Sequence, residues 1–321
     1  MFIRTIAALT LATTPALADN WDLPMAWPEG NFNTQSAGVF AEEVKAATDG
    51  RVDITIHPGG SLGFKGPEML GAVRDGLVPI GDLLLPQQIG DEPLLGLPGL
   101  PFMFASFDAF ESFDDYFRDD LEDIMDSHNQ KVLYTIPWPA PQVWVKQELT
   151  DIDSLANIRV RTYDKTSTEV YSAAGMTSVQ LPWGEVIPSL ASGAIEGVVT
   201  SSSSAVDGSF WEFLSHGYPT SHSWNLNAMT VNADAWAGLS EEDQAAIEKV
   251  ATDLQPTFWE TARAEDAAKK AILAENGMTL GEVSDDLHNA LVERATPMRE
   301  AALESLGDKA KAILDGYAAA Q

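Results

Sequence analysis

The chain has 321 residues, no cysteine and a formal net charge of −29 at pH 7. The lack of cysteine excludes disulfides, thiolate catalysis and cysteine metal sites. The acidity argues against nucleic acid or an anionic membrane surface as a partner. Beyond the first 18 residues about 300 remain, a length that suits two domains better than one.

The first 18 residues have the pattern of a secretory signal peptide: a basic residue (Arg4), an apolar middle and an Ala-x-Ala end at 16–18. The apolar run is short for a membrane span, although an uncleaved membrane anchor is the alternative. No Cys follows the run, which excludes a lipoprotein anchor. No later stretch is apolar enough to cross a bilayer. We therefore expect a signal peptide at 1–18 and a periplasmic mature protein without stable membrane insertion.

The next 70 residues or so alternate between strands and helices. Residue patterns predict strands at 21–27, 51–57 and 78–85, and helices at 34–48 and 67–75. This order predicts a βαβαβ lobe. Trp27, Glu29 and Lys65 fall at a strand end or near the first strand-to-helix loops, where ligands bind in such folds. The alternatives are lobe packing for Trp27 and solvated surface groups for Glu29 and Lys65.

Residues 91–144 connect this lobe to the rest of the chain. The phenylalanines of this region are more typical of a lobe core than of a substrate site, and the acidic run 114–126 is typical of a solvated helix face. The stretch 132–144 contains two tryptophans and three prolines, and we interpret it as an interdomain crossing. Trp138 and Gln142 are candidates for pocket lining.

The run 151–200 predicts strand, helix, strand, helix and strand. The strands are expected at 158–163, 177–181 and 195–200, with a capping box at Thr166–Glu169 and helix stops at Gly175 and Gly193. Parallel strands joined by right-handed crossovers bind ligands beyond their carboxyl ends. Arg161, Trp183 and Thr200 lie at or just past those ends. A cation, an aromatic face and a hydroxyl are thus expected to converge, which suits a small anion with an apolar body.

Three pieces of this run resemble the signature of one family: Leu155–Arg161, Leu181–Val186 and Gly193–Gly197. The family is that of the solute-binding proteins of TRAP (tripartite ATP-independent periplasmic) transporters. The resemblance covers essentially the whole mature chain. It implies an α/β, two-lobed periplasmic-binding-protein-like fold, with a ligand cleft between the lobes and a long helix spanning both. It also implies that Arg161 forms a salt bridge with a substrate carboxylate.

The chain departs from the family pattern at two places. Some members with highly polar substrates carry a second arginine near Pro141 and Gln142, so its absence here weakens readings that need two fixed cations, such as a dicarboxylate. Thr200, followed by four serines, occupies the place of a common asparagine; a hydroxyl still donates one hydrogen bond. The resemblance also places Trp27 at the pocket.

The C-terminal part supplies a returning strand and long helices. Residues 223–232 predict a strand that returns to the first lobe, with Trp224 as a candidate for the pocket or for interdomain packing. Ser240 is the expected N-cap of a long helix in which Pro256 predicts a kink or interruption. We expect lobe I at 19–143 with about 226–260, and lobe II at 144–225 with the C-terminal helices of about 261–321 packing across it.

No catalytic motif is present: the sequence lacks a Gly-x-Ser-x-Gly elbow, a P-loop and a Gly-x-Gly-x-x-Gly fingerprint, and its five histidines show no metal-ligand spacing. We predict no cofactor and assign no metal ligand. The expected function is that of a TRAP solute receptor, not an enzyme, which binds a small organic carboxylate and delivers it to the small and large membrane subunits. The tryptophans favour an aromatic or ring-shaped ligand body, ectoines included. The alternatives are an exported binding domain that feeds a sensor and, less favoured, an exported hydrolase.

Overall fold

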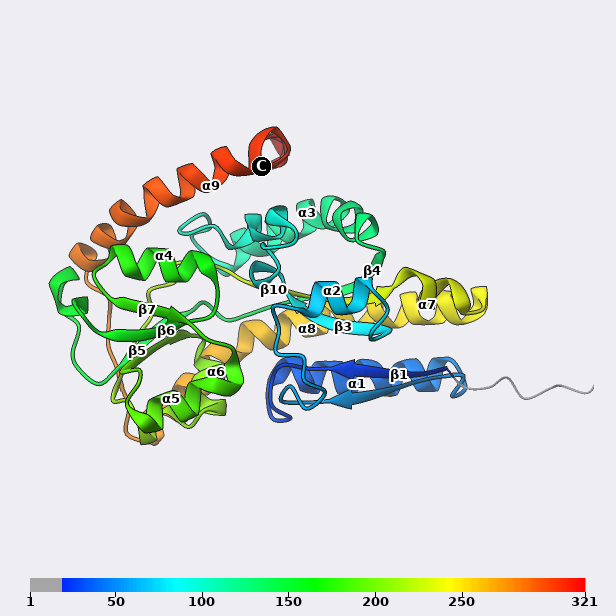
Figure 1. Cartoon of the computed structure of the whole chain (residues 1–321), viewed down its shortest axis with the longest axis horizontal. Helices are drawn as coiled ribbons and strands as arrows, with labels where there is room; N and C mark the ends of the chain where they lie inside the picture. Colours follow the sequence, from blue (N-terminus) through cyan, green and yellow to red (C-terminus); the bar gives the residue numbers. More distant parts are fainter. Residues whose placement is uncertain (1–18, 321) are drawn as a thin grey trace, which may run out of the picture.

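The computed structural model describes residues 19–320, so the expected signal peptide lies outside the described part. The strands form two groups that lie at opposite ends of an elongated molecule (Figure 1). We call the group around β1–β4 and β10 lobe I, and the six-stranded sheet with its helices lobe II. Within the described residues no helix is long and apolar enough to cross a membrane.

Lobe I contains two ladders. β1 (Asp19–Pro24) and β2 (Val52–His57) pair in parallel, while β3 (Ile80–Leu84) and β4 (Gln130–Pro137) flank β10 (Leu226–Asn232). Because β10 is antiparallel to both neighbours, the lobe is not the purely parallel unit that alternation of strands and helices predicts. β10 begins 89 residues after Pro137, the last residue of β4. Its return to lobe I confirms the strand predicted at 223–232, whereas its antiparallel place between β3 and β4 is not encoded by a local pattern.

Lobe II has the strand order β11-β9-β5-β8-β6-β7. Its parallel part confirms the predicted strand–helix alternation of the central run: β6 (Arg159–Thr162) lies between β7 (Thr177–Gln180) and β8 (Gly197–Thr200). β5 (Gln142–Val145) runs antiparallel to β8 and β9 (His216–Tyr218), and β11 (Thr279–Leu280) is parallel to β9. The carboxyl ends of β6 and β8 therefore meet at one edge.

The helices of the described residues are α1 (Phe32–Ala47), α2 (Met69–Arg74), α3 (Phe107–Ser127), α4 (Lys165–Ala173), α5 (Val186–Ser192), α6 (Ser202–Asp207), α7 (Ala233–Gly238), α8 (Glu241–Glu275) and α9 (Asp285–Ala320). The predicted stops and caps at Gly193 and Ser240 are confirmed. The prediction of a capping box at Thr166–Glu169 is wrong. Asp164 caps α4 instead, because its carboxylate accepts from the Ser167 amide.

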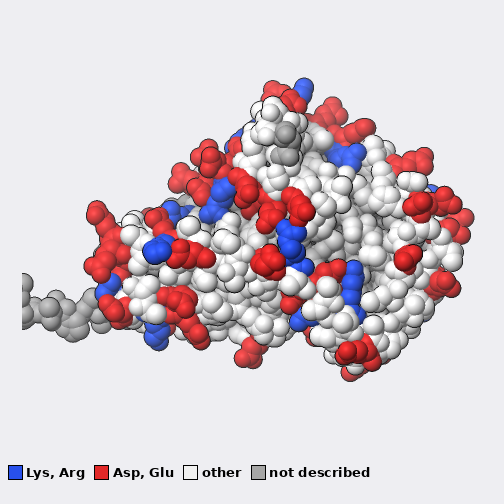
Figure 2. All heavy atoms as spheres, turned by 180° about the vertical axis from the view of Figure 1, so that it is seen from behind, with Lys and Arg blue, Asp and Glu red and all other residues white. Residues whose placement is uncertain are grey.

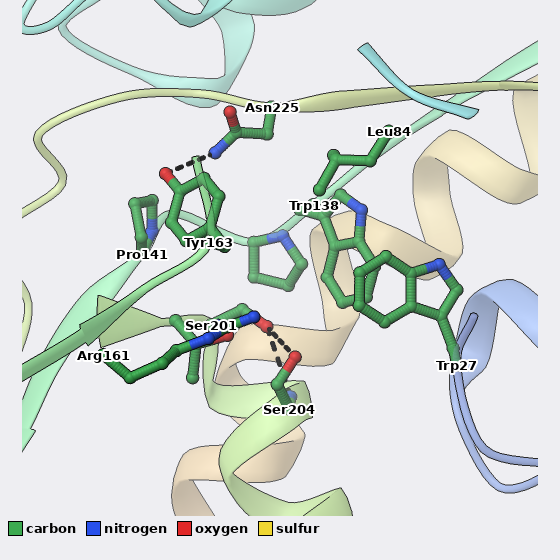
Figure 3. A pocket seen from close by; sticks show the side chains of 11 residues that line it. Trp27, Leu84, Trp138, Pro141, Arg161, Tyr163, Ser201, Ser204 and Asn225 are labelled. Atoms are coloured by element: carbon green, nitrogen blue, oxygen red, sulfur yellow. Dashed lines mark hydrogen bonds between the residues drawn. The ribbon is translucent and has the colours of Figure 1, made fainter. Parts of the chain in front are cut away.

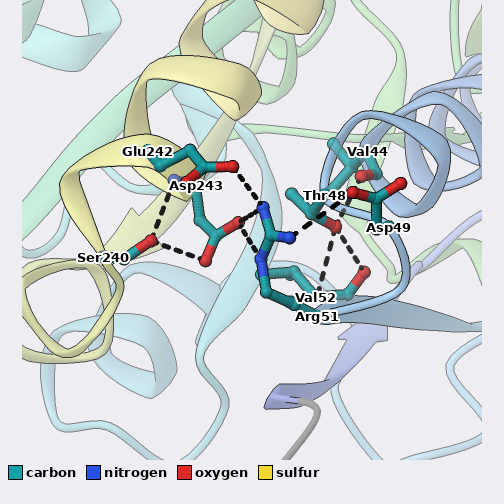
Figure 4. A network of polar contacts seen from close by, with 8 residues as sticks. All are labelled: Val44, Thr48, Asp49, Arg51, Val52, Ser240, Glu242 and Asp243. Atoms are coloured by element: carbon teal, nitrogen blue, oxygen red, sulfur yellow. Dashed lines mark hydrogen bonds and ion pairs between the residues drawn. The ribbon is translucent and has the colours of Figure 1, made fainter. Parts of the chain in front are cut away.

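Two long helices join the lobes. α8 packs on α1 and β4 in lobe I and on α6 and β11 in lobe II, and it continues through Pro256 without interruption. At its start, Arg51 of lobe I pairs with Glu242 and Asp243 (Figure 4). α9 lies on α4, bends at Gly307, and then contacts α3 of lobe I.

The phenylalanines of the connecting region serve mainly as core. Phe104, Phe110 and Phe113 are buried in the apolar cluster of lobe I, beside Trp224 and Trp259. Phe107 is only partly buried, and Phe102 packs against a second cluster.

Candidate functional site

One pocket gathers residues from both lobes and from the segments that connect them. It encloses about 360 Å³, part of which is open solvent, and is lined by Trp27, Leu84, Trp138, Pro139, Pro141, Arg161, Tyr163, Thr200, Ser201, Ser204 and Asn225. In Figure 3 Arg161 extends toward Ser201 and Ser204, whereas Trp27 and Trp138 lie at the other end. The pocket thus has a cationic, hydroxyl-bearing end and an aromatic end.

Arg161 is positioned by its strand. It is the third residue of β6, 1 % exposed, and its Nε donates to the carbonyl of Leu181 at 2.9 Å. Within residues 19–320 it forms no ion pair with a carboxylate. Burial lowers the pKa of the guanidinium to about 10, partly offset by the charges of Tyr163 and Asp164, so the group stays charged at neutral pH.

The hydroxyls of this end come from the turn between β8 and α6. Ser201 caps α6 and accepts from the amide of Ser204, and the two hydroxyls lie 3.3 Å apart. Their neighbours Ser202 and Ser203 turn the other way and donate to Asp266 and Glu265 of α8. The turn is therefore tied to the long helix on one side and faces the pocket on the other.

The aromatic end is built by two indoles. The rings of Trp27 and Trp138 meet edge to face with centroids 4.7 Å apart, and Phe32 packs on Trp138 at 5.1 Å. Trp27 follows β1, and Trp138 opens the crossing between β4 and β5. Tyr163 stands above Arg161 and receives a hydrogen bond from Asn225 at 2.9 Å.

Four of the eight predicted site residues line this pocket: Arg161, Thr200, Trp27 and Trp138. Trp183 does not line it, but its ring centroid lies 6.0 Å from the Arg161 guanidinium carbon. It therefore contacts the cation from outside the cavity.

The other three predicted residues lie elsewhere. Gln142 is buried and donates to Asp266 of α8 at 3.0 Å. Trp224 is a core residue whose indole donates to the carbonyl of Phe104. Lys65 is exposed and pairs across the cleft with Glu185 of lobe II at 3.4 Å. Glu29 lies in a separate surface groove.

Sequence reasoning missed Tyr163, Ser201, Ser204 and Asn225. Tyr163 has a usable signal, because residues i and i+2 of a strand share a face and Tyr163 follows Arg161 by two. Ser201 directly follows the strand end at Thr200. Asn225 has no such signal, since it lies in the irregular segment before β10.

The lobes also touch beside the pocket. Asn31 donates to Asp207 across the cleft at 2.6 Å, and Gln87 donates to the carbonyl of Tyr163 at 3.0 Å. Burial raises the pKa of Asp207 to about 6. These contacts describe a cleft whose two walls already meet.

The family model for bacterial extracellular solute-binding protein, family 7 (DctP) matches residues 23–305. The chain belongs to this family of TRAP solute-binding proteins. The ectoine-binding periplasmic protein TeaA of Halomonas elongata is 26% identical over 98% of this chain and 94% of its own. Members of the family are extracytoplasmic solute receptors rather than enzymes.

Solved structures agree with this assignment. DctP7 of Bordetella pertussis, a receptor that binds pyroglutamic acid, matches with a TM-score of 0.90 and 26% identity over 94% of this chain and 99% of its own. A pyroglutamate-specific TRAP solute-binding protein from an unidentified marine microbe matches with a TM-score of 0.89 and 31% identity, again over 94% and 99%. The two-lobed α/β fold predicted from the sequence is confirmed.

Proposed function

We propose that this TRAP receptor binds a small cyclic monocarboxylate, with the carboxylate on Arg161 and the ring against Trp27 and Trp138. The observation that carries the proposal is the buried Arg161, which has no carboxylate partner within the described residues. A buried charge is costly unless it is paired. An anionic ligand would supply the missing partner, through charge-assisted and bidentate hydrogen bonds.

The lining of the pocket narrows the ligand class. Beyond the hydroxyls near Arg161, the walls are largely tryptophan, proline and leucine, so a sugar acid would leave several hydroxyls unpaired. Pyroglutamate, a five-membered lactam with one carboxylate, is the first candidate because relatives at 26% and 31% identity bind it.

Ectoine is the second candidate. It combines a carboxylate with a ring that carries a delocalised cation, and TeaA binds it. Indole faces attract such cations, which favours ectoine at the Trp27–Trp138 end. The absence of an acidic side chain from the pocket lining favours the uncharged lactam.

We further propose that ligand binding favours the closed arrangement of the lobes and that the TRAP membrane subunits recognise it. The lobes proposed to move are 19–143 with about 226–260, and 144–225 with the C-terminal helices. The contacts of Lys65 with Glu185 and of Asn31 with Asp207 support a closed cleft.

Isothermal titration of the purified mature protein with pyroglutamate, ectoine and glucuronate tests the ligand assignment. We expect pyroglutamate to bind most tightly, and Arg161→Ala to cost about 2–5 kcal/mol of binding free energy. The matched control is Arg159→Ala, two residues earlier on the same strand. Arg159 is exposed and pairs with Glu196 and the carbonyls of Gly193 and Ala194.

Arg159→Ala should leave the affinity within a factor of about two, which is the scale of ordinary surface substitutions. Equal affinity of the wild type and Arg161→Ala would contradict the carboxylate assignment. Tighter binding of glucuronate, a sugar acid whose ring carries several hydroxyls, than of pyroglutamate or ectoine would contradict the assignment of the aromatic end to a ring without hydroxyls.

A further inference from the structure

Both tryptophans of the pocket are tethered by the same buried polar pair. The Nε1 of Trp27 donates to Oδ2 of Asp82 at 3.1 Å, and the Nε1 of Trp138 donates to Oδ1 of Asn227 at 2.7 Å. Asn227 in turn donates to the same Oδ2 of Asp82 at 2.7 Å. One continuous chain of hydrogen bonds therefore links the two indoles.

The sheet explains how this chain is built. Asp82 lies on β3 and Asn227 on the adjacent β10, whose register pairs Asn227 with Leu84 and Met229 with Asp82. Asp82 and Asn227 are thus diagonal cross-strand neighbours, close enough for side chains to meet. Trp27 follows β1, and Trp138 directly follows β4, which flanks β10 on its other side. The pair thus holds one indole that follows β1 and one that follows β4.

The placement of Asp82 is costly for a purely structural residue. The side chain is 4 % exposed and has no cationic partner within residues 19–320. Burial raises the pKa of its carboxyl to about 7 despite the hydrogen bonds from Asn227 and Trp27. An apolar residue would cost less at this position.

Three other buried indoles donate to backbone groups instead. Trp144, Trp224 and Trp259 donate to the backbone carbonyls of Thr200, Phe104 and Thr135. Trp27 and Trp138 instead donate to side chains, and one of these acceptors, the carboxyl of Asp82, can carry a charge. A bond to a charged acceptor is stronger than a neutral one. The bond from Trp27 to Asp82 is 3.1 Å long, and the bond from Trp138 to Asn227, at 2.7 Å, is the shortest of the five.

We propose that Asp82 and Asn227 are positioning residues of the ligand site, which fix the indoles of Trp27 and Trp138 as a preformed wall for the ligand ring. This inference takes its ligand from the proposed function, whereas the hydrogen bonds that support it are independent of that function. A wall that is already ordered spares the ligand the entropic cost of ordering two large side chains.

The test compares Asp82→Asn with the exchange Asp82→Asn/Asn227→Asp. The single variant replaces the carboxylate by an amide of equal size. The exchange moves the carboxylate to β10 and retains a partner for each of the two indoles. Asp114→Asn is the control, because Asp114 is a second buried carboxyl of lobe I that bonds Thr135 and touches neither indole.

The first readout is the indole N–H region of a ¹H–¹⁵N spectrum without ligand, assigned with Trp27→Phe and Trp138→Phe. In Asp82→Asn the resonances of Trp27 and Trp138 should move and exchange faster with solvent. Those of Trp144, Trp224 and Trp259 should stay. In the exchange variant the resonance of Trp138 should move toward the charge-assisted position and that of Trp27 away from it.

The second readout is affinity for pyroglutamate. Ordering one such side chain costs about 0.5–1.5 kcal/mol, and 1.4 kcal/mol is tenfold. Asp82→Leu, which leaves Trp27 and Asn227 without their shared acceptor, should therefore bind about tenfold more weakly, whereas Asp82→Asn keeps an oxygen that accepts both bonds and should lose less. The exchange variant should bind more tightly than Asp82→Leu, and Asp114→Asn should bind like the wild type. Unchanged indole resonances in Asp82→Asn would overturn the proposal, as would unchanged affinity in Asp82→Leu. If the wild type binds no cyclic acid, the proposed function fails, while the indole resonances still decide whether the pair fixes the wall.

Discussion

Arg161 is held by its own lobe, and within the described residues no acidic partner is in contact with it. Its Nε bonds the Leu181 carbonyl, the Trp183 ring lies 6.0 Å from its guanidinium carbon, and burial lowers its pKa to about 10. If this cation served the fold, its removal would destabilise the empty protein. If it serves a ligand, the empty protein bears the cost of its burial, and removing the charge relieves that cost.

Arg161→Met should therefore raise the free energy of unfolding of the ligand-free protein by about 1–3 kcal/mol and weaken ligand binding by about 2–5 kcal/mol, as Arg161→Ala does. Methionine fills much of the same volume without a charge. Urea denaturation, followed by circular dichroism, measures the first effect and calorimetry the second. The control Arg159→Met should change stability by no more than about 0.5 kcal/mol. A marked loss of stability in Arg161→Met would assign the arginine to the fold instead.

At the residue scale, the sequence predicts the segments that reach the pocket more reliably than the side chains that line it. Strand ends locate Arg161, Thr200 and Trp27, because parallel strands share one functional edge. They do not reveal partners distant in sequence. Gln142 turns to Asp266, 124 residues later, and Trp224 turns to the carbonyl of Phe104. The Asp82–Asn227 pair is likewise visible only once β10 lies beside β3.

At the scale of elements, local chemistry predicts helix ends well and helix continuity less well. Ser240 and Gly193 act as expected because capping depends on a few neighbouring groups. The capping of α4 begins at Asp164 because a carboxylate two residues earlier competes with Thr166 for the same role. α8 continues through Pro256 because its packing on both lobes outweighs the loss of one backbone hydrogen bond.

Gly307 of α9 offers a test of helix geometry. Its φ of 72° and ψ of −156° belong to a region that is essentially restricted to glycine. Gly307→Ala should therefore destabilise the protein by about 1–3 kcal/mol and loosen residues 308–320 from α3. The measurement is thermal unfolding combined with hydrogen exchange of those residues.

The matched control is Gly38→Ala. Gly38 lies inside α1 with open space around the added methyl group, so alanine should stabilise by about 0.5–1 kcal/mol. Equal effects of the two substitutions would mean that the bend at Gly307 is not required by the fold.

At the scale of the whole molecule, carboxylates divide into a large surface set and a small buried set. Figure 2 shows acidic side chains scattered over the visible face with fewer basic ones between them, as the net charge of −29 implies. Asp82, Asp114 and Asp164 are buried instead. Composition predicts the first set. It says nothing about the second, which depends on strand pairing and helix packing.

The architecture likewise has a part that the sequence predicts and a part that depends on contacts between distant segments. Strand–helix alternation predicts the parallel part of lobe II and the first two strands of lobe I, because both arise from short-range patterns. The antiparallel entry of β10 and the passage of α9 onto α3 arise from contacts between distant segments. Those contacts bring the lobes together around the pocket.

The buried carboxyl of Asp114 makes the stability of the whole protein depend on pH in a defined direction. Burial raises its pKa from 3.8 to about 7, although the hydrogen bond from Thr135 and the charge of Arg118 oppose the rise. Between these two values the folded state holds a proton that the unfolded state releases. The contribution of Asp114 to stability is therefore largest at acidic pH and is lost as the pH rises toward about 7.

Asp114→Asn imitates the protonated form and should remove this dependence. Tenfold in proton affinity is worth about 1.4 kcal/mol, so the variant should gain up to about 4 kcal/mol over the wild type at pH 8 and only about 2 kcal/mol at pH 5. Denaturation in about 1 M salt, where the screening length is about 3 Å, suppresses surface repulsion in both proteins. The control Asp126→Asn, an exposed carboxylate near the other end of α3, should change the free energy of unfolding by no more than about 0.5 kcal/mol at either pH. A stability difference between Asp114→Asn and the wild type that does not grow with pH would mean that Asp114 stays ionised in the folded protein.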